Sequence, residues 1–217
     1  MQQRNRQFIY HTWTSLLLLT FCLLVSGCDA LGFMVYALNG PETEIVPAEY
    51  TGLNNSRLAV LVSADSNTLY QSPEAPNAIC SAVTRELATK VPGCIVLQPS
   101  KVNAYVEDNP YWHTIPYDRL LIQLEVEQLV IIDIVQYQIH DKGNGSVFKG
   151  TAIANISVAK RSDGNTLAYS KTVKATYPSG SSVGMVAAEE QSFRLALLQN
   201  LTTTIGHLFY EYQVIHE

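Results

Sequence analysis

The sequence lacks a strongly basic segment, and this absence excludes some classes of binding partner. Its 217 residues include 14 Lys and Arg against 19 Asp and Glu, so the formal charge is −5. Nucleic acids and anionic membrane surfaces recruit proteins through an excess of Lys and Arg. The composition therefore excludes nucleic-acid binding and attachment to lipid headgroups through a polybasic patch.

Metal-binding and phosphate-binding patterns are also missing. The histidines show neither i,i+4 pairing nor a cysteine partner, so no zinc-site spacing exists. They are His11, His113, His140, His207 and His216. No glycine-rich loop of the kind that cradles phosphate is present. The sequence therefore predicts neither a metal nor a cofactor.

Cysteine is scarce in the body of the chain, where only Cys80 and Cys94 occur. A predicted helix separates them, and a helix of about a dozen residues is ~18 Å long. A disulfide requires Cα atoms within ~7 Å of each other. We therefore expect two buried free thiols rather than a disulfide.

The amino-terminal region, by contrast, carries a clear targeting pattern. Arg4 and Arg6 form a positive segment, residues 15–24 are apolar, and Val25-Ser26-Gly27-Cys28 follows. Small residues at the end of a short apolar segment are typical of an export signal. Their place directly before a cysteine resembles the lipobox of bacterial lipoproteins. That resemblance implies a signal peptide over 1–27, cleavage before Cys28 and lipid attachment to the Cys28 thiol.

Two features of this region bear on localisation. Residues 15–38 are long enough to span a bilayer, so an uncleaved transmembrane anchor is the alternative, although Gly27, Asp29 and Gly32 interrupt the apolar stretch. Asp29 directly after the lipidated cysteine resembles an inner-membrane retention signal.

Removal of residues 1–27 takes Arg4 and Arg6 away, which leaves 12 basic and 19 acidic residues and a charge of −7. We expect a membrane protein anchored by lipid at Cys28 on the periplasmic side.

The first half of the remaining chain predicts a tether followed by a β-α-β unit. Residues 28–56 are mixed in character, and we expect one α/β domain over 57–217. The apolar run 58–62 predicts a buried strand, and 95–97 predicts a second strand parallel to it. Between them, apolar residues every four positions mark a helix that Asn77 could cap. These apolar positions are Ile79, Val83, Leu87 and Val91.

The second half predicts a helix, three strands and a final helix. Spacing from Tyr117 favours a helix, although Leu120 to Val126 also alternate as a strand would. Strands are expected over 129–140, 147–160 and 167–175, with turns at 141–145 and 161–165. A buried stripe marks the last helix, over 187–212, and consists of Phe193, Leu197, Leu201, Ile205 and Leu208-Phe209. The fold class is thus α/β (α+β), a β-α-β-α-β-β-β-α mixed sheet with covering helices.

This order of elements behind a lipobox resembles a group of bacterial envelope lipoproteins. The group includes the curli-secretion lipoprotein (CsgG), the lipoprotein activator of penicillin-binding proteins (LpoB) and the amino-terminal domain of TolB. The likeness covers residues 57–212 and rests on strand pattern rather than a short motif. It implies an anticodon-binding-domain-like fold and a function through protein contacts without catalysis. Channel formation is not expected, because the turns at 141–145 and 161–165 are too short for membrane-crossing hairpins.

Two places could carry catalytic chemistry. Gly180-Ser181-Ser182-Val183-Gly184 matches the G-x-S-x-G pattern of hydrolases. Only 35 residues follow Ser182, too few for strands bearing an acid and a base, so a flexible serine-glycine loop is the simpler interpretation. Asp133 stands among apolar residues and could be a perturbed acid, but a position on a wetted strand face is more common.

The aromatic segment 105–117 is the sequence-level candidate for partner binding. It contains Tyr105, Tyr111, Trp112, His113 and Tyr117. Trp and Tyr dominate binding hot spots, but large aromatics after Pro110 can also fold over the core, and packing is the favoured interpretation. The overall prediction is an interaction, assembly or accessory module that meets an unidentified envelope protein or other copies of itself. The alternatives are a serine hydrolase using Gly180–Gly184 and an auxiliary lipoprotein of an envelope transporter.

Overall fold

The computed structural model describes residues 43–141, 144–178 and 190–215. Cys28, Asp29, the loop 180–184 and His216 lie outside these residues. The chain divides into a large compact unit, Pro47–Tyr212, and a small one formed by Met1–Val46 with Gln213–Glu217. Each unit is described below by itself.

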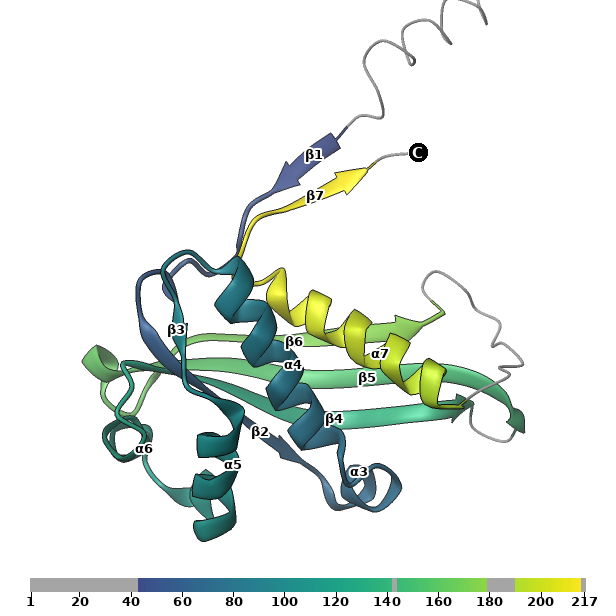
Figure 1. Cartoon of the computed structure of the whole chain (residues 1–217), viewed down its shortest axis with the longest axis horizontal. Helices are drawn as coiled ribbons and strands as arrows, with labels where there is room; N and C mark the ends of the chain where they lie inside the picture. The colour runs from purple at the N-terminus through teal and green to yellow at the C-terminus, as the bar shows by residue number, and fades with distance from the viewer. Residues whose placement is uncertain (1–42, 142–143, 179–189, 216–217) are drawn as a thin grey trace, which may run out of the picture. The chain divides into compact units, whose positions relative to one another are not determined.

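The large unit is built on a five-stranded mixed sheet in the order β3-β2-β4-β5-β6 (Figure 1). Strand β2 (Arg57–Ala64) runs parallel to both β3 (Ile95–Val96) and β4 (Gln128–Asp141). Strands β5 (Asn144–Lys160) and β6 (Leu167–Tyr177) complete it as an antiparallel meander. The predicted mixed α/β fold and the parallel β-α-β unit are confirmed.

Two long helices, α4 (Ala75–Lys90) and α7 (Glu190–Gly206), cover one face of the sheet. Their apolar stripes are buried, as the sequence periodicity predicts: Ile79, Val83 and Leu87 on α4, and Phe193, Leu197, Leu201 and Ile205 on α7. Gly150 of β5 lies directly beneath α7. A Cβ atom there would lie 3.1 Å from the side chains of both Phe193 and Leu197. This glycine therefore lets the helix approach the sheet closely.

The aromatic residues over 100–116 predict an irregular loop, but this segment forms a second layer of helix instead. The segment forms α5 (Pro99–Asp108) and a 3-10 turn, η1 (Trp112–Thr114), before α6 (Tyr117–Gln123). Pro99 occupies the first turn of α5, where a missing N–H costs nothing. Val102 is buried and Val106 half-buried, so the pair supplies the helix with an apolar stripe. The expected helix beginning at Tyr117 is confirmed, and the alternative strand is wrong.

Other element boundaries also depart from the sequence expectations. A short helix, α3 (Ser66–Gln71), replaces part of the expected loop, because the Asp65 carboxylate caps it by accepting from the Thr68 N–H at 2.8 Å. Helix α4 begins at Ala75, so Asn77 lies inside it and is not its cap. Helix α7 ends at Gly206 instead of reaching 212.

Packing of the large unit starts before Arg57, where we expected the domain to begin. Leu53 is fully buried, and Ser56 Oγ donates to the Leu53 carbonyl at 2.6 Å. The side-chain amide of Gln128, itself buried on β4, donates to the Gly52 carbonyl at 2.6 Å. Part of the expected tether 28–56 is thus bound to the sheet.

The small unit contains a two-stranded sheet of β1 (Thr43–Val46) and β7 (Tyr212–Ile215). Neither strand was expected, because each has only four residues and its pairing joins distant parts of the chain. Within the described ranges, no helix is both long enough and apolar enough to cross a membrane.

Candidate interaction surfaces

The face of the sheet opposite α4 and α7 is covered at one end only. Alternation along each strand places every second side chain on this face. Near the start of β4 these side chains, such as Leu61 and Leu129, are fully buried, and α6 packs against β4 and β5. Farther along the strands Asp133 and Thr172 are exposed. The helix layer therefore leaves half of this face open.

A row of polar residues crosses four strands of the open half. Ser63, Asp133, Asn155 and Thr172 are direct neighbours in the register of β2, β4, β5 and β6. Ser63 Oγ donates to Asp133 Oδ1 at 2.9 Å, and Thr172 Oγ1 donates to Asn155 Oδ1 at 2.7 Å. These bonds fix the orientation of the row. Asp133 therefore lies on a wetted strand face, the simpler of the two interpretations.

Apolar and charged side chains flank this row. Val135, at a bulge of β4, is 48% exposed, Lys174 of β6 is exposed, and Ile153 is half-buried. We call the surface formed by Ser63, Asp133, Val135, Asn155, Thr172 and Lys174 the open sheet face. Its mixture of polar and apolar groups, with one acid and one base, resembles the composition of non-obligate protein interfaces.

Strand β6 lies at the edge of the described sheet, beside this face. It has 11 residues and is the last strand of the described sheet. An edge strand presents N–H and C=O groups that another strand can pair with. Exposed Lys171 and Lys174 lie on it, and Lys171 forms an ion pair with Glu49. Such lysines discourage unselective pairing.

The aromatic segment 105–117 does not form one surface. Trp112 is 5% exposed and belongs to the core, whereas Tyr111 is 75% exposed. His113 is also exposed, and its ring centroid lies 6.5 Å from that of Tyr111. Tyr105 is half-buried, and its hydroxyl donates to Gln123 Oε1 at 2.5 Å. Of the five candidate residues in this segment, Tyr111 and His113 are therefore the exposed ones.

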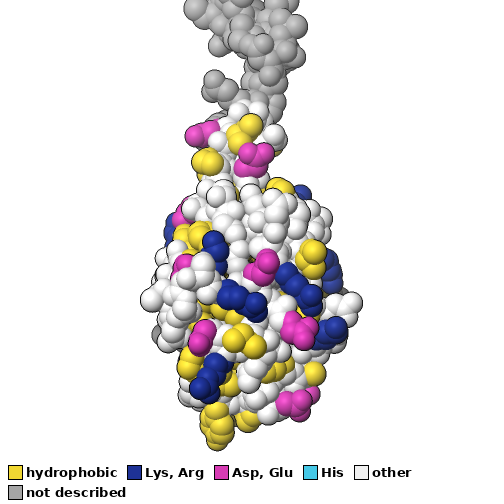
Figure 2. All heavy atoms as spheres, turned by 90° about the vertical axis from the view of Figure 1, so that its left-hand side faces the viewer, with side chains coloured by type: hydrophobic (Ala, Val, Ile, Leu, Met, Phe, Trp, Pro, Cys, Tyr) yellow, Lys and Arg dark blue, Asp and Glu magenta, His cyan; other side chains and the backbone are white. Residues whose placement is uncertain are grey.

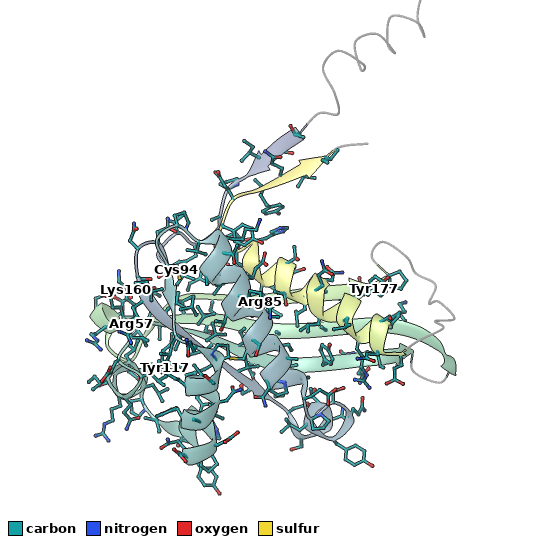
Figure 3. All side chains as sticks on the ribbon, viewed as in Figure 1. Arg57, Arg85, Cys94, Tyr117, Lys160 and Tyr177 are labelled. Carbon is teal, nitrogen blue, oxygen red and sulfur yellow. The ribbon has the colours of Figure 1, made fainter. Side chains whose placement is uncertain are left out.

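Tyr117, labelled in Figure 3, lies at the start of α6 and is half-buried. Its backbone N–H donates to Asn165 Oδ1 at 2.8 Å, which joins α6 to the turn before β6. The guanidinium of Arg161 donates from the same turn to the carbonyls of Leu121 and Val126, at 3.3 and 3.1 Å. The backbone of Tyr117 thus takes part in the hydrogen bonds that hold α6 against the turn between β5 and β6.

The thiols are poorly suited to nucleophilic chemistry. Cys80 and Cys94 are free, as expected, and Cys80 Sγ donates to the Val60 carbonyl at 3.3 Å. Burial raises the pKa of each thiol to about 11. Both groups are therefore protonated near neutral pH, and a thiol attacks only as its thiolate. In the described ranges, no three His, Cys, Asp or Glu side chains gather as metal ligands would.

His207 lies just beyond the end of α7, against aromatic rings. Its ring stacks on Tyr212 at a centroid distance of 3.5 Å, and Tyr210 meets its edge at 5.6 Å. Burial lowers the pKa of His207, while the charge of Glu86 opposes that shift. Tyr210 donates to Glu86 Oε1 at 2.5 Å. The hydrogen bond from Tyr210 to Glu86 thus links the segment that follows α7 to α4.

Charge on the side of the large unit shown in Figure 2 is mixed. Basic and acidic side chains alternate there with small apolar areas and do not gather into a region of one sign. That distribution agrees with the absence of a basic segment in the sequence.

Comparisons with known proteins give a likeness of fold alone. No family model and no curated protein matches the chain. Among solved structures, the PelC dodecamer from Paraburkholderia phytofirmans is similar with 10% identity, over 78% of this chain and 97% of that one, at a TM-score of 0.47. Lipoprotein GNA1162 from Neisseria meningitidis has 11% identity to this chain. The match covers 68% of this chain and 96% of that one, at a TM-score of 0.46. An uncharacterized lipoprotein B from Nitrosomonas europaea has 10% identity to this chain. The match covers 75% of this chain and 89% of that one, at a TM-score of 0.31.

Proposed function

We propose that this chain is a non-catalytic interaction module, held by lipid on Cys28 at the periplasmic side of a bacterial membrane. It binds an envelope protein through the open sheet face. The observation that carries this proposal is the ordered polar row of Ser63, Asp133, Asn155 and Thr172, which stays uncovered although α6 packs on the same face of the sheet. A surface that is rigid and already hydrogen-bonded loses little entropy when it binds.

The anchor is supported by sequence. A positive segment, an apolar segment and a small pair precede Cys28, and two or three acyl chains together make a stable anchor. Asp29 favours the inner membrane. Separation of the two membranes on a density gradient tests this, because Asp29→Ser should move the chain toward the outer membrane. Recovery in the outer membrane irrespective of this substitution would contradict it.

The environments of the described thiols and of Asp133 support a binding role. Of the two described thiols, Cys80 is buried and Cys94 is half-buried, and Asp133 accepts a hydrogen bond from the Ser63 hydroxyl on an exposed strand face. The rival function is a serine hydrolase that uses Ser181 or Ser182, which lie outside the described residues. A fluorophosphonate reagent separates the two functions, because labelling at either serine would favour the hydrolase.

A photoreactive residue tests the proposed binding surface. Placed at Val135 or Thr172 in intact cells, it should cross-link to one envelope protein of constant mass. The matched control is Leu195, an apolar residue on α7 that is 58% exposed. A partner that proves to be a membrane transporter would make the chain an auxiliary lipoprotein of that transporter. Equal cross-linking at all three positions, or none at Val135 and Thr172, would count against the open sheet face.

Tyr111 and His113 form a second candidate contact. Their favouring observation is an aromatic ring that is 75% exposed, next to an exposed imidazole. Tyrosine contributes large contact area with few rotatable bonds. The same photoreactive residue at Tyr111 tests this contact, and an adduct of the same mass as at Thr172 would place both on one partner.

A further inference from the structure

The β1–β7 sheet of the small unit is too small to be stable by itself in water. It consists of two strands of four residues, and no third strand of the described chain joins it (Figure 1). An isolated two-stranded ribbon needs a covering surface for independent stability. We call this pair of strands the ribbon.

The ribbon is rich in exposed apolar side chains. Ile45 of β1 and Ile215 of β7 are each 60% exposed. Val46, Tyr212 and Val214 are half-buried. Together with the two isoleucines, they make five of the ribbon's eight residues apolar or aromatic. Exposed apolar residues gathered on so small an element indicate a surface that something covers.

The distance along the chain between the ribbon and the lipid is short. Fourteen residues, 29–42, separate Cys28 from Thr43. Fully extended, they reach at most about 50 Å. All of residues 31–38 except Gly32 are apolar, so only 39–42 are a mainly polar connection, with a reach of about 14 Å. The bilayer that holds the anchor is therefore the apolar phase nearest to the ribbon.

From these observations we propose that the ribbon lies in the headgroup region of the same bilayer, with Ile45 and Ile215 in contact with lipid. This inference rests on the proposed lipid anchor at Cys28. Apolar side chains enter the boundary between headgroups and acyl chains. Glu44 and Glu211 flank these residues, so the ribbon should gain nothing from anionic lipid.

Fluorescent labels on the lipidated full chain test this placement. Ile45→Cys and Ile215→Cys carry the label in a chain with Cys80→Ala and Cys94→Ala, and Leu195→Cys is the control of matched exposure. The acylated Cys28 does not react. The chains are reconstituted into phosphatidylcholine vesicles, with quenchers either in the acyl chains, as brominated lipid, or in water, as iodide. Vesicles containing phosphatidylglycerol form a second arm.

Brominated lipid should quench the labels at positions 45 and 215 and leave the label at 195 unaffected, whereas iodide should quench only position 195. The pattern should be the same with phosphatidylglycerol present. Iodide quenching at all three positions would overturn the proposal. Protection of positions 45 and 215 from both quenchers would also overturn it, and would point to pairing with a protein strand. Co-sedimentation of the unlabelled chain with vesicles reports the anchor separately, so loss of sedimentation would identify a failure of the proposed function.

Discussion

At the scale of single residues, Trp112 and Tyr111 are neighbours in sequence with opposite environments. Trp112 is 5% exposed and joins the core, while Tyr111 is 75% exposed. Sequence could predict that aromatics of this segment either pack or bind, but it could not assign the two roles. The assignment depends on η1, whose 3-10 turn directs one ring inward and leaves the other in solvent.

We predict that Trp112→Ala destabilises the fold by about 3–5 kcal/mol, as expected for truncation of a buried aromatic residue. Tyr111→Ala should change the free energy of unfolding by less than about 0.5 kcal/mol, because surface substitutions rarely do more. Urea denaturation of the two variants beside the parent protein measures both values. Equal midpoints for Trp112→Ala and the parent would show that the indole is not a core element.

The two thiols give stability a dependence on alkaline pH. Burial raises the pKa of Cys80 and Cys94 from 9.0 to about 11, so the folded state holds the thiol proton more tightly than the unfolded state. The free energy that the protonated thiols contribute to folding is fully present below about pH 9 and is lost as the pH rises toward 11. We predict that the difference in unfolding free energy between the parent and Cys94→Ala shifts in favour of the variant over this range. A difference that stays constant from pH 8 to 11 would refute the shifted pKa of Cys94.

At the scale of elements, α7 is defined by the contrast between its two sides. Leu201 is fully buried against the sheet and α4, whereas Leu195, on the same helix, is 58% exposed. We predict that Leu201→Ala costs about 2–5 kcal/mol of stability, and that Leu195→Ala stays within about 0.5 kcal/mol of the parent. Chemical denaturation of both variants provides the comparison, in which identical losses would mean that the stripe does not face the core.

Periodicity predicted the elements with the most regular pattern. Ile79, Val83 and Leu87 recur every four residues, and α4 follows them. Strands β4, β5 and β6 were predicted from their long apolar and alternating runs and their turn residues. Periodicity overextended α7, because Leu208 and Phe209 continue its apolar spacing although the chain turns at Gly206, where Phe209 N–H donates to the Gly206 carbonyl at 2.8 Å.

Elements fixed by tertiary contacts were not predictable in the same way. Helix α5 was not predicted, because the aromatic residues of its segment obscured the spacing of Val102 and Val106. The polar row on the open sheet face depends on which residues of four strands become neighbours, and no single strand contains that information. Asp133 was singled out by sequence, but Asn155 and Thr172 were not, since neither differs from an ordinary strand residue until the register is known.

At the scale of the whole molecule, a folded unit with an open sheet face follows the proposed lipid anchor in the sequence. The mixed α/β fold expected from the sequence is the fold of the large unit. The proposed membrane position of the protein depends on Cys28, which lies outside the described residues. Every proposal about partners at the envelope rests on that cysteine.

The most direct measurement is therefore acyl labelling of the Cys28→Ala chain, followed by membrane fractionation. We predict that the parent chain incorporates labelled palmitate and sediments with membranes after cleavage before residue 28. The Cys28→Ala chain should incorporate none, and should remain as an uncleaved precursor or be released as a soluble product. Palmitate incorporation and fractionation that are both unchanged by Cys28→Ala would contradict the lipid anchor and the function built on it.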